Sequence, residues 1–324
     1  MSKHTYHQTK MALGSDVSLN VVTDRNQANV ETYFNSLWQS IFMFERQFSR
    51  FLPLSELSQF NQQAGSRQVI SNEFQDILRA SSRLSFETKG LHNPFILPVL
   101  QRVGYATSFV GDYGDEPEIN FSNRTLTTSE KLQIGDNWAM IPYGTAIDLG
   151  GCGKGYLGDT LASSNMPDWV SGYWFSFGGD VVGGGFDEMG QPWLVEIKDT
   201  LDANLPAVGQ FINTKDSFHI ATSSIKERRG TRQGKKWHHI IDPRTRLPAD
   251  TDIVTATVAA DTLILADVLA TSAIILGSQD APEFLSNLGM ESALFGLDNG
   301  IGNTTYRNYG KFIHTYEMQK VAVA

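Results

Sequence analysis

Residues 145–159, TAIDLGGCGKGYLGD, carry the residue types best suited to binding a phosphate group. Their order predicts a short β-strand, a glycine-rich turn and the start of a helix. Glycines let a backbone approach a ligand closely, free N–H groups at a helix N-terminus attract anions, and Lys154 adds a positive charge. The segment therefore predicts a site for a phosphate-bearing ligand, although glycines that only allow a strand and a helix to pack closely would give the same pattern.

Two known phosphate-binding motifs share features with this segment. Gly153–Gly158 satisfies the dinucleotide pattern G-x-G-x-x-G, with 173–177 as a second strand and Asp180 at about the distance of a ribose contact. The unit lies in the middle of the chain without further βα repeats, which disfavours this interpretation. The P-loop is excluded, because Gly155 follows Lys154 where that motif requires Ser or Thr.

An apolar segment further along the chain carries a candidate metal site. Asp267 and Thr271 are four residues apart in a predicted helix that opens at Asp261 and ends at Gly277, so they share one face. A buried carboxylate is costly unless it has a partner, which favours a metal over a structural role. Mg²⁺ fits best, because it is habitually held by few protein oxygens together with phosphate and the chain shows no Cys/His cluster for zinc.

His238 and His239 are adjacent, so on a strand only one of them can point into a shared pocket. His239 is expected to share its face with Trp237 and Ile241. A histidine beside Asp242 can act as a general base, and a hydrogen-bonded structural histidine fits the same pattern. The residues alone leave both roles open.

Cys152, the only cysteine, excludes a disulfide framework. No histidine, lysine or arginine pairing pattern activates it, so it is expected to be a small buried residue and not a nucleophile.

Composition limits the class of protein. The chain has 324 residues, of which 41% are hydrophobic and 19% charged, as in an ordinary globular protein of one large domain or two closely joined ones. The net charge of −9 and the lack of a long basic run argue against nucleic acid or an anionic membrane surface as the main partner. The N-terminus lacks an apolar signal segment, which predicts a cytoplasmic location, and 263–276 is too short to span a bilayer.

Hydrophobic periodicity predicts the elements that position these residues. Residues 16–22 alternate as in a half-buried strand, and apolar residues recur at helical spacing from about residue 27. Ser55 is expected to cap a short second helix. Further strands are expected at 173–177, 193–197, 218–222 and 253–260.

A third helix is predicted from a capping box. Asn72 with Gln75 gives the signal for its start, and the helix is expected to reach about Lys89 and to stop at Gly90. Residues 104–136 show weak periodicity and are expected to form a loop with short strands.

Six blocks of sequence, spread over nearly the whole chain, occur in an order that resembles one enzyme family. The blocks are Phe48–Phe51 with Ser55 and Asn61; Asp148–Gly151 with Lys154 and Asp159; Gly178–Asp180; Ala221–Ser223; His239–Thr245; and Ala266–Thr271. This succession resembles the ApbE-type FAD:protein FMN transferases.

The resemblance implies an α+β fold, with a largely antiparallel β-sheet core, packed helices and a T-fold-related architecture. It implies one flavin transferase domain over residues 1–324, or two closely joined subdomains with the FAD site between them. Members of the family use Mg²⁺ to split FAD, transfer the FMN half to a threonine hydroxyl of an acceptor protein, and release AMP. FAD hydrolysis to FMN and AMP by a pyrophosphatase, and FAD binding without catalysis, are the alternative functions.

The resemblance also implies a role for each site residue. His239 would activate the acceptor threonine, and Asp267 and Thr271 would bind Mg²⁺ together with a backbone carbonyl of Gly150 or Gly151. The residues implied to line the FAD pocket are Ser49, Ser55, Asn61, Lys154, Asp159, Gly178, Gly179, Thr222 and Ser223.

The chain departs from the family pattern at three places. Ser224 and Arg246 stand where the family often has glycine, and Gly90-Leu-His-Asn-Pro replaces the more usual Gly-x-Phe-Asp. The blocks for metal and phosphate are intact, whereas Arg246 puts a local turn and access of the acceptor in question.

Overall fold

A central eight-stranded sheet organises the chain. The computed structural model describes residues 2–107, 123–164, 166–198, 207–213, 215–232, 234–290, 292–298, 304–310 and 312–314. The strands of this sheet, in spatial order, are β1 (His4–Ala12), β2 (Ser15–Thr23), β6 (Val170–Phe177), β7 (Asp180–Gly185), β10 (Ser217–Ser224), β15 (Ile253–Ala260), β16 (Ala293–Asp298) and β17 (Thr304–Tyr309). All neighbouring strands within it are antiparallel, which confirms the predicted α+β class.

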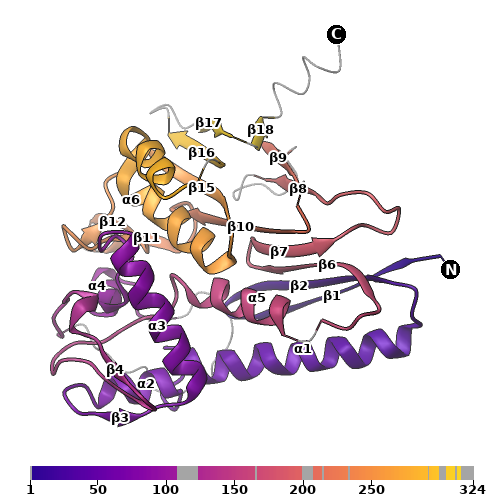
Figure 1. Cartoon of the computed structure of the whole chain (residues 1–324). Coiled ribbons are helices and arrows are strands. Elements are labelled where there is room, and N and C mark those ends of the chain that lie inside the picture. The colour runs from indigo at the N-terminus through magenta and orange to yellow at the C-terminus, as the bar shows by residue number, and fades with distance from the viewer. Residues whose placement is uncertain are drawn as a thin grey trace.

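Three helices pack on one face of this sheet: α1 (Gln27–Phe48), α5 (Gly153–Ser163) and α6 (Leu263–Asn287). Figure 1 shows α1 extended along β1 and β2, with α5 between it and α6. Alternate residues of β2, including Val17, Leu19 and Val21, are buried against the helices. The aromatic residues of α1 complete this core, and each large apolar side chain so buried contributes about 1.5–3 kcal/mol.

A small sheet covers part of the other face. It consists of β18 (Phe312–His314), β9 (Gly209–Ile212) and β8 (Leu194–Ile197). Phe218 and Ile220 of β10 pack in this second core, whereas Ala221 belongs to the core on the helix side. Because successive side chains of a strand point to opposite faces, these residues show that both faces of β10 are covered.

The remaining elements form the layer seen at the lower left of Figure 1 and the hairpins that border it. They are α2 (Glu56–Gln62), α3 (Asn72–Glu87), η1 (Pro94–Ile96), α4 (Leu97–Val103), η2 (Ser129–Lys131), a sheet of β3 (Gln68–Val69), β5 (Trp138–Met140) and β4 (Gln133–Gly135), and the hairpins β11 (Arg229–Arg232) with β12 (Lys235–His238) and β13 (Ile241–Asp242) with β14 (Leu247–Pro248).

The strand predicted at the start of segment 145–159 is wrong. Residues 145–149 run without strand pairing. The Asn61 amide substitutes for a neighbouring strand, donating to the Ile147 carbonyl at 2.8 Å and accepting from the Ile147 N–H at 2.7 Å. A buried side-chain amide can satisfy a backbone in this way without any periodic signal in the sequence.

Two predicted helix boundaries need correction. α3 is capped by Ser71, whose hydroxyl accepts from the Phe74 N–H, while Gln75 bonds to the Gly135 carbonyl instead of forming a capping box. α6 begins after Thr262 and continues to Asn287 through a backbone break at Gly277 (φ 77°). Residues 108–122 of the predicted loop lie outside the described residues.

α6 is longer than the apolar segment predicted from sequence. By length and apolar composition alone, it is the one helix in the described part of the chain that could cross a membrane. Its apolar residues, among them Leu269, Ala273 and Ile274, are buried against β15 and β16. Packing inside the protein therefore accounts for the apolar character of the helix.

Candidate active site

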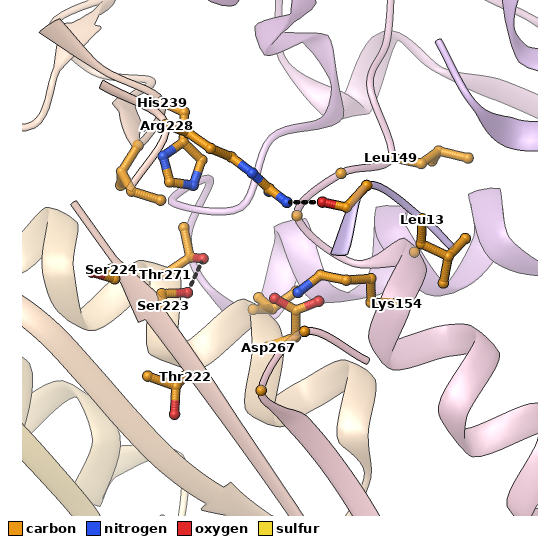
Figure 2. Close-up of a pocket in the computed structure, with 18 of the residues that line it drawn as sticks. Leu13, Leu149, Lys154, Thr222, Ser223, Ser224, Arg228, His239, Asp267 and Thr271 are labelled. Atoms are coloured by element: carbon orange, nitrogen blue, oxygen red, sulfur yellow. Dashed lines mark hydrogen bonds between the residues drawn. The ribbon is translucent and has the colours of Figure 1, made fainter. Parts of the chain in front are cut away.

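A cavity of about 590 Å³ lies where the glycine turn before α5, the first half of α6 and the end of β10 meet. Figure 2 shows Lys154 of α5, Asp267 and Thr271 of α6, and Ser223 of β10 gathered around this place. The predicted site residues that line it are Ser49, Gly150, Gly151, Lys154, Gly178, Gly179, Thr222, Ser223, His239, Asp267 and Thr271. The fold thus brings eleven of the predicted residues to one place.

The glycine turn serves both the cavity and the packing of helices. Gly150, Gly151 and Gly153 line the cavity at the N-terminus of α5, where the helix dipole favours an anion. A Cβ on Gly155 would lie 2.5 Å from the Ile264 Cα, so only glycine lets α5 contact the backbone of α6. Gly150, Gly151 and Gly153 therefore fit the prediction of a ligand site, whereas Gly155 serves the close packing of two elements.

Lys154 is held by a carboxylate on the neighbouring strand. Its ammonium group forms an ion pair with Asp180, which is only 1% exposed and also accepts from the Thr222 N–H at 3.1 Å. Burial opposes the charge of Lys154, but the carboxylates of Asp180 and Asp267 outweigh burial and raise its pKa. Lys154 is therefore a fixed positive charge in the cavity wall.

The Asp267 carboxylate is only partly satisfied: it accepts a hydrogen bond from the Gly155 backbone N–H. It is buried, and its Oδ2 has no hydrogen-bond partner among the described residues. Burial and, next, the Asp180 carboxylate raise its pKa to about 7, while Lys154 opposes the shift. A cation would satisfy this oxygen, so the site fits the predicted Mg²⁺.

Thr271 and Ser223 lie beside this carboxylate and share a hydrogen bond of 2.8 Å. The described residues contain no group of three His, Cys, Asp or Glu side chains that could hold a metal. A cation here would accordingly be held by one carboxylate with hydroxyl, carbonyl and ligand oxygens, which suits a hard ion such as Mg²⁺.

His239 faces the cavity as predicted, although the strand that precedes it ends at His238. Burial, and after it the charge of Arg228, lowers the pKa of His239 to about 3. The imidazole is therefore neutral, and its buried Nδ1 has no hydrogen-bond partner in the described structure. His238 points elsewhere, with its Nε2 3.0 Å from the Ala249 carbonyl.

Gly178 and Gly179 form the turn between β6 and β7 at the cavity edge. Both have positive φ angles, 66° and 96°, which L side chains rarely adopt. A Cβ on Gly178 would also lie 2.7 Å from the Ser15 hydroxyl. The glycines therefore allow this turn to lie against the start of β2.

Three residues predicted to line the pocket lie outside the cavity lining. Ser55 caps α2 through the Ser58 N–H, and Asn61 is fully buried against Ile147. Asp159 accepts from the N–H groups of Leu263 and Ile264, at 2.7 and 2.9 Å, and so caps α6. These side chains position the cavity walls, because their polar atoms are used by backbone groups.

The departures from the family pattern are all accommodated. Ser224, Leu91, His92 and Asn93 line the cavity. Arg246 adopts the left-handed conformation (φ 61°) that glycine adopts more readily, and its N–H donates to the Asp242 carbonyl at 2.8 Å. The turn is thus kept despite the larger side chain.

Two charged groups of the cavity wall stand outside the predicted set of site residues: Arg50, which lies in one of the six blocks, and Arg228. Arg50 forms an ion pair with Asp148 at 3.2 Å, and both side chains are buried. Arg228 enters the cavity from the turn before β11. The only sequence signal for Arg228 was its place in a basic segment, which does not show where a side chain points.

His92 should make stability depend on pH. It bonds to Ser81 at 2.8 Å, and burial lowers its pKa from 6.5 to about 4. The unfolded chain then binds a proton between pH 6.5 and 4 while the folded chain does not, so stability is lost as pH falls through this range, by about 3 kcal/mol at 1.36 kcal/mol per pKa unit.

We expect His92→Gln to reduce this loss, measured as urea unfolding free energies at pH 7 and pH 5. His4→Gln, which changes an exposed histidine on β1, is the control and should keep the wild-type slope. An unchanged pH dependence in His92→Gln would contradict the assignment.

Cys152→Ala should retain most of any activity of this cavity. The thiol is completely buried, and burial, with Asp267 as the next contribution, raises its pKa far above the ordinary value, so it is no nucleophile. The expected cost is about 1 kcal/mol of stability. A folded but inactive Cys152→Ala protein would show that the thiol takes part.

The chain is similar in sequence and in structure to known proteins. The sequence model of the ApbE family matches residues 13–295. An FAD:protein FMN transferase of Vibrio cholerae serotype O1 is 26% identical over 277 residues, 84% of this chain and 82% of the relative, and one of Haemophilus influenzae is 24% identical over 97% and 90%. The structure of Pseudomonas stutzeri flavinyl transferase ApbE, apo form, superposes with a TM-score of 0.79 at 21% identity, covering 96% of each chain.

Proposed function

Because the chain belongs to the ApbE family, we propose that it is an FAD:protein FMN transferase that uses Mg²⁺ to move FMN from FAD onto a threonine of an acceptor protein, with release of AMP. The transferase activity follows the names of its relatives. The observation that carries the proposal is the buried, unpartnered oxygen of Asp267 in a cavity that also holds Lys154 and His239.

The cavity suits a large phosphate-bearing ligand. Its volume of about 590 Å³ lies within the range of about 300–1,000 Å³ usual for small-molecule sites. Its wall combines aromatic residues, such as Phe48 and Tyr105, with the N-terminus of α5 and Lys154. An aromatic ring system and an anionic diphosphate thus both find matching surfaces.

Asp267, Thr271 and a carbonyl of Gly150 or Gly151 would hold the Mg²⁺. The ion supplies neutralisation of the charge that develops on the diphosphate. Lys154 contributes a second positive charge, which Asp180 fixes in place.

The proposed reaction exchanges a phosphoanhydride bond of the diphosphate for a phosphoester bond to threonine. The threonine oxygen bonds to the phosphorus of the FMN half, the bond from that phosphorus to the bridging oxygen breaks, and AMP leaves with the bridging oxygen. The hydroxyl proton passes to the neutral imidazole of His239. His239 faces the cavity and is unprotonated, so its free ring nitrogen is available to accept this proton.

The test is incubation of the purified protein with FAD and Mg²⁺, with and without an extract of the cells that produce it. A transferase gives a protein band with covalent flavin fluorescence and an equivalent of AMP. FMN and AMP without a labelled protein would show a pyrophosphatase. Unchanged FAD in both samples would leave only a binding protein, and the proposal would be wrong.

A further inference from the structure

Two turns meet across the mouth of the cavity. Leu13 and Gly14 join β1 to β2 and both have positive φ angles, 54° and 66°. Arg228, also at positive φ (44°), extends from the opposite side, and its guanidinium donates to the Gly14 carbonyl at 3.5 Å. Figure 2 shows this side chain reaching across the cavity toward the turn that holds Leu13. A non-glycine residue in this conformation is uncommon and often marks a functional position.

Arg228 is bonded to a neutral carbonyl, whereas two other cations of the cavity wall are paired with carboxylates. Arg50 is paired with Asp148, and Lys154 with Asp180. Lys198 lies exposed at the rim. The guanidinium of Arg228 has five N–H donors, and its one hydrogen bond within the described residues is a long one to a neutral carbonyl. It therefore has the largest unused capacity for an anionic ligand.

The position of Arg228 also suits a phosphate. Its charge acts on Lys154, on His239 and on Asp267, as the pKa shifts of these three groups show. These groups surround the place where the diphosphate and the acceptor hydroxyl would meet. A planar guanidinium can donate two parallel hydrogen bonds to phosphate oxygens, which a lysine cannot do.

We propose that Arg228 binds the diphosphate of the flavin nucleotide from the side opposite α5, with the Leu13–Gly14 turn holding its side chain in position. This rests on the proposed function, since it takes FAD as the ligand. Arg228 is then a binding residue for the phosphates and makes no contact that the flavin ring requires.

The test compares a ligand with phosphates and one without. Dissociation constants for FAD and for riboflavin are measured by flavin fluorescence in Mg²⁺ buffer, for wild type, Arg228→Gln, Arg228→Lys and Arg229→Gln. Arg228→Gln should weaken FAD binding about 10- to 100-fold, as expected for loss of a charge-assisted hydrogen bond, and leave riboflavin unchanged. Arg228→Lys should lie between, because it keeps the charge but loses the fork.

Arg229→Gln is the matched control, because it removes the same charge from the next residue, which is exposed and does not line the cavity. It should bind both ligands as wild type does. Gln at position 228 makes the same backbone demand as Arg, and thermal unfolding checks that the variant folds.

Equal FAD affinity in wild type and Arg228→Gln would overturn the inference, while transfer of flavin by the wild type would still support the proposed function. Equal weakening of FAD and riboflavin would also overturn it, since it would indicate a structural role. A wild-type protein that binds no FAD would contradict the proposed function itself, and the inference with it.

Discussion

Asp267→Ala is expected to abolish flavin transfer and AMP release while the protein stays folded. The substitution removes the one carboxylate of the proposed Mg²⁺ site, and charge stabilisation by such an ion is worth several kcal/mol. Transfer should therefore fall about 10³-fold or more, measured as AMP release by chromatography. Alanine is well accepted in a helix, and loss of the acceptor for the Gly155 N–H should cost about 1 kcal/mol, so the variant stays folded.

Stability measurements distinguish the metal site from a structural role. Mg²⁺ should raise the unfolding temperature of the wild type and leave that of Asp267→Asn unchanged, because only a folded site binds the ion. Asp261→Asn, which changes an exposed carboxylate just before α6, should respond to Mg²⁺ as the wild type does. Full activity of Asp267→Ala at ordinary Mg²⁺ would contradict the assignment.

His239→Ala should lose transfer to the acceptor by about 10²–10⁴-fold, the usual contribution of a general base. FAD and Mg²⁺ should still bind, because His239 lies on the side of the cavity away from the Asp267 carboxylate (Figure 2). Slow hydrolysis of FAD can persist, since water attacks without a positioned acceptor. The measurements are covalent flavin on the acceptor, AMP release, and FAD affinity by fluorescence.

His238→Ala is the matched control. Its imidazole bonds to the Ala249 carbonyl and does not line the cavity, so the variant should keep transfer and lose about 1 kcal/mol of stability with the hydrogen bond. Loss of transfer in His238→Ala together with normal transfer in His239→Ala would show that the wrong histidine has been assigned.

The sequence predicted most of the regular elements and the residues of the cavity that occur in short blocks. Period-two alternation located β2, and helical spacing located α1 at its observed start. Asp267 and Thr271 were placed on one face by their spacing alone, and the structure brings both to the cavity. Local patterns are sufficient where one element carries both residues.

Three residues predicted to line the pocket lie outside it because backbone groups use their polar atoms. Asn61, Asp159 and Ser55 looked like ligand contacts because they are polar and lie in the right blocks. The structure uses their oxygens to satisfy backbone N–H groups, and for Asn61 and Asp159 these belong to segments far along the chain. Arg228 was not predicted for a different reason. The direction of its side chain follows from a backbone conformation with positive φ, which no local sequence pattern indicates.

The cap that Asp159 provides for α6 has a consequence for the order of folding. The two partners are separated by 104 residues, so this carboxylate joins the Thr262 hydroxyl at the first turn of α6 only after the chain between them has been made and folded back. Contacts of such sequence separation form late, because the loop entropy must be lost before they stabilise anything. During synthesis, α5 and its glycine turn leave the ribosome well before the carboxylate and the histidine that complete the cavity. A chain that stops short of α6 therefore lacks Asp267 and Thr271 and cannot form the site. Activity is thus expected only from chains that have folded completely.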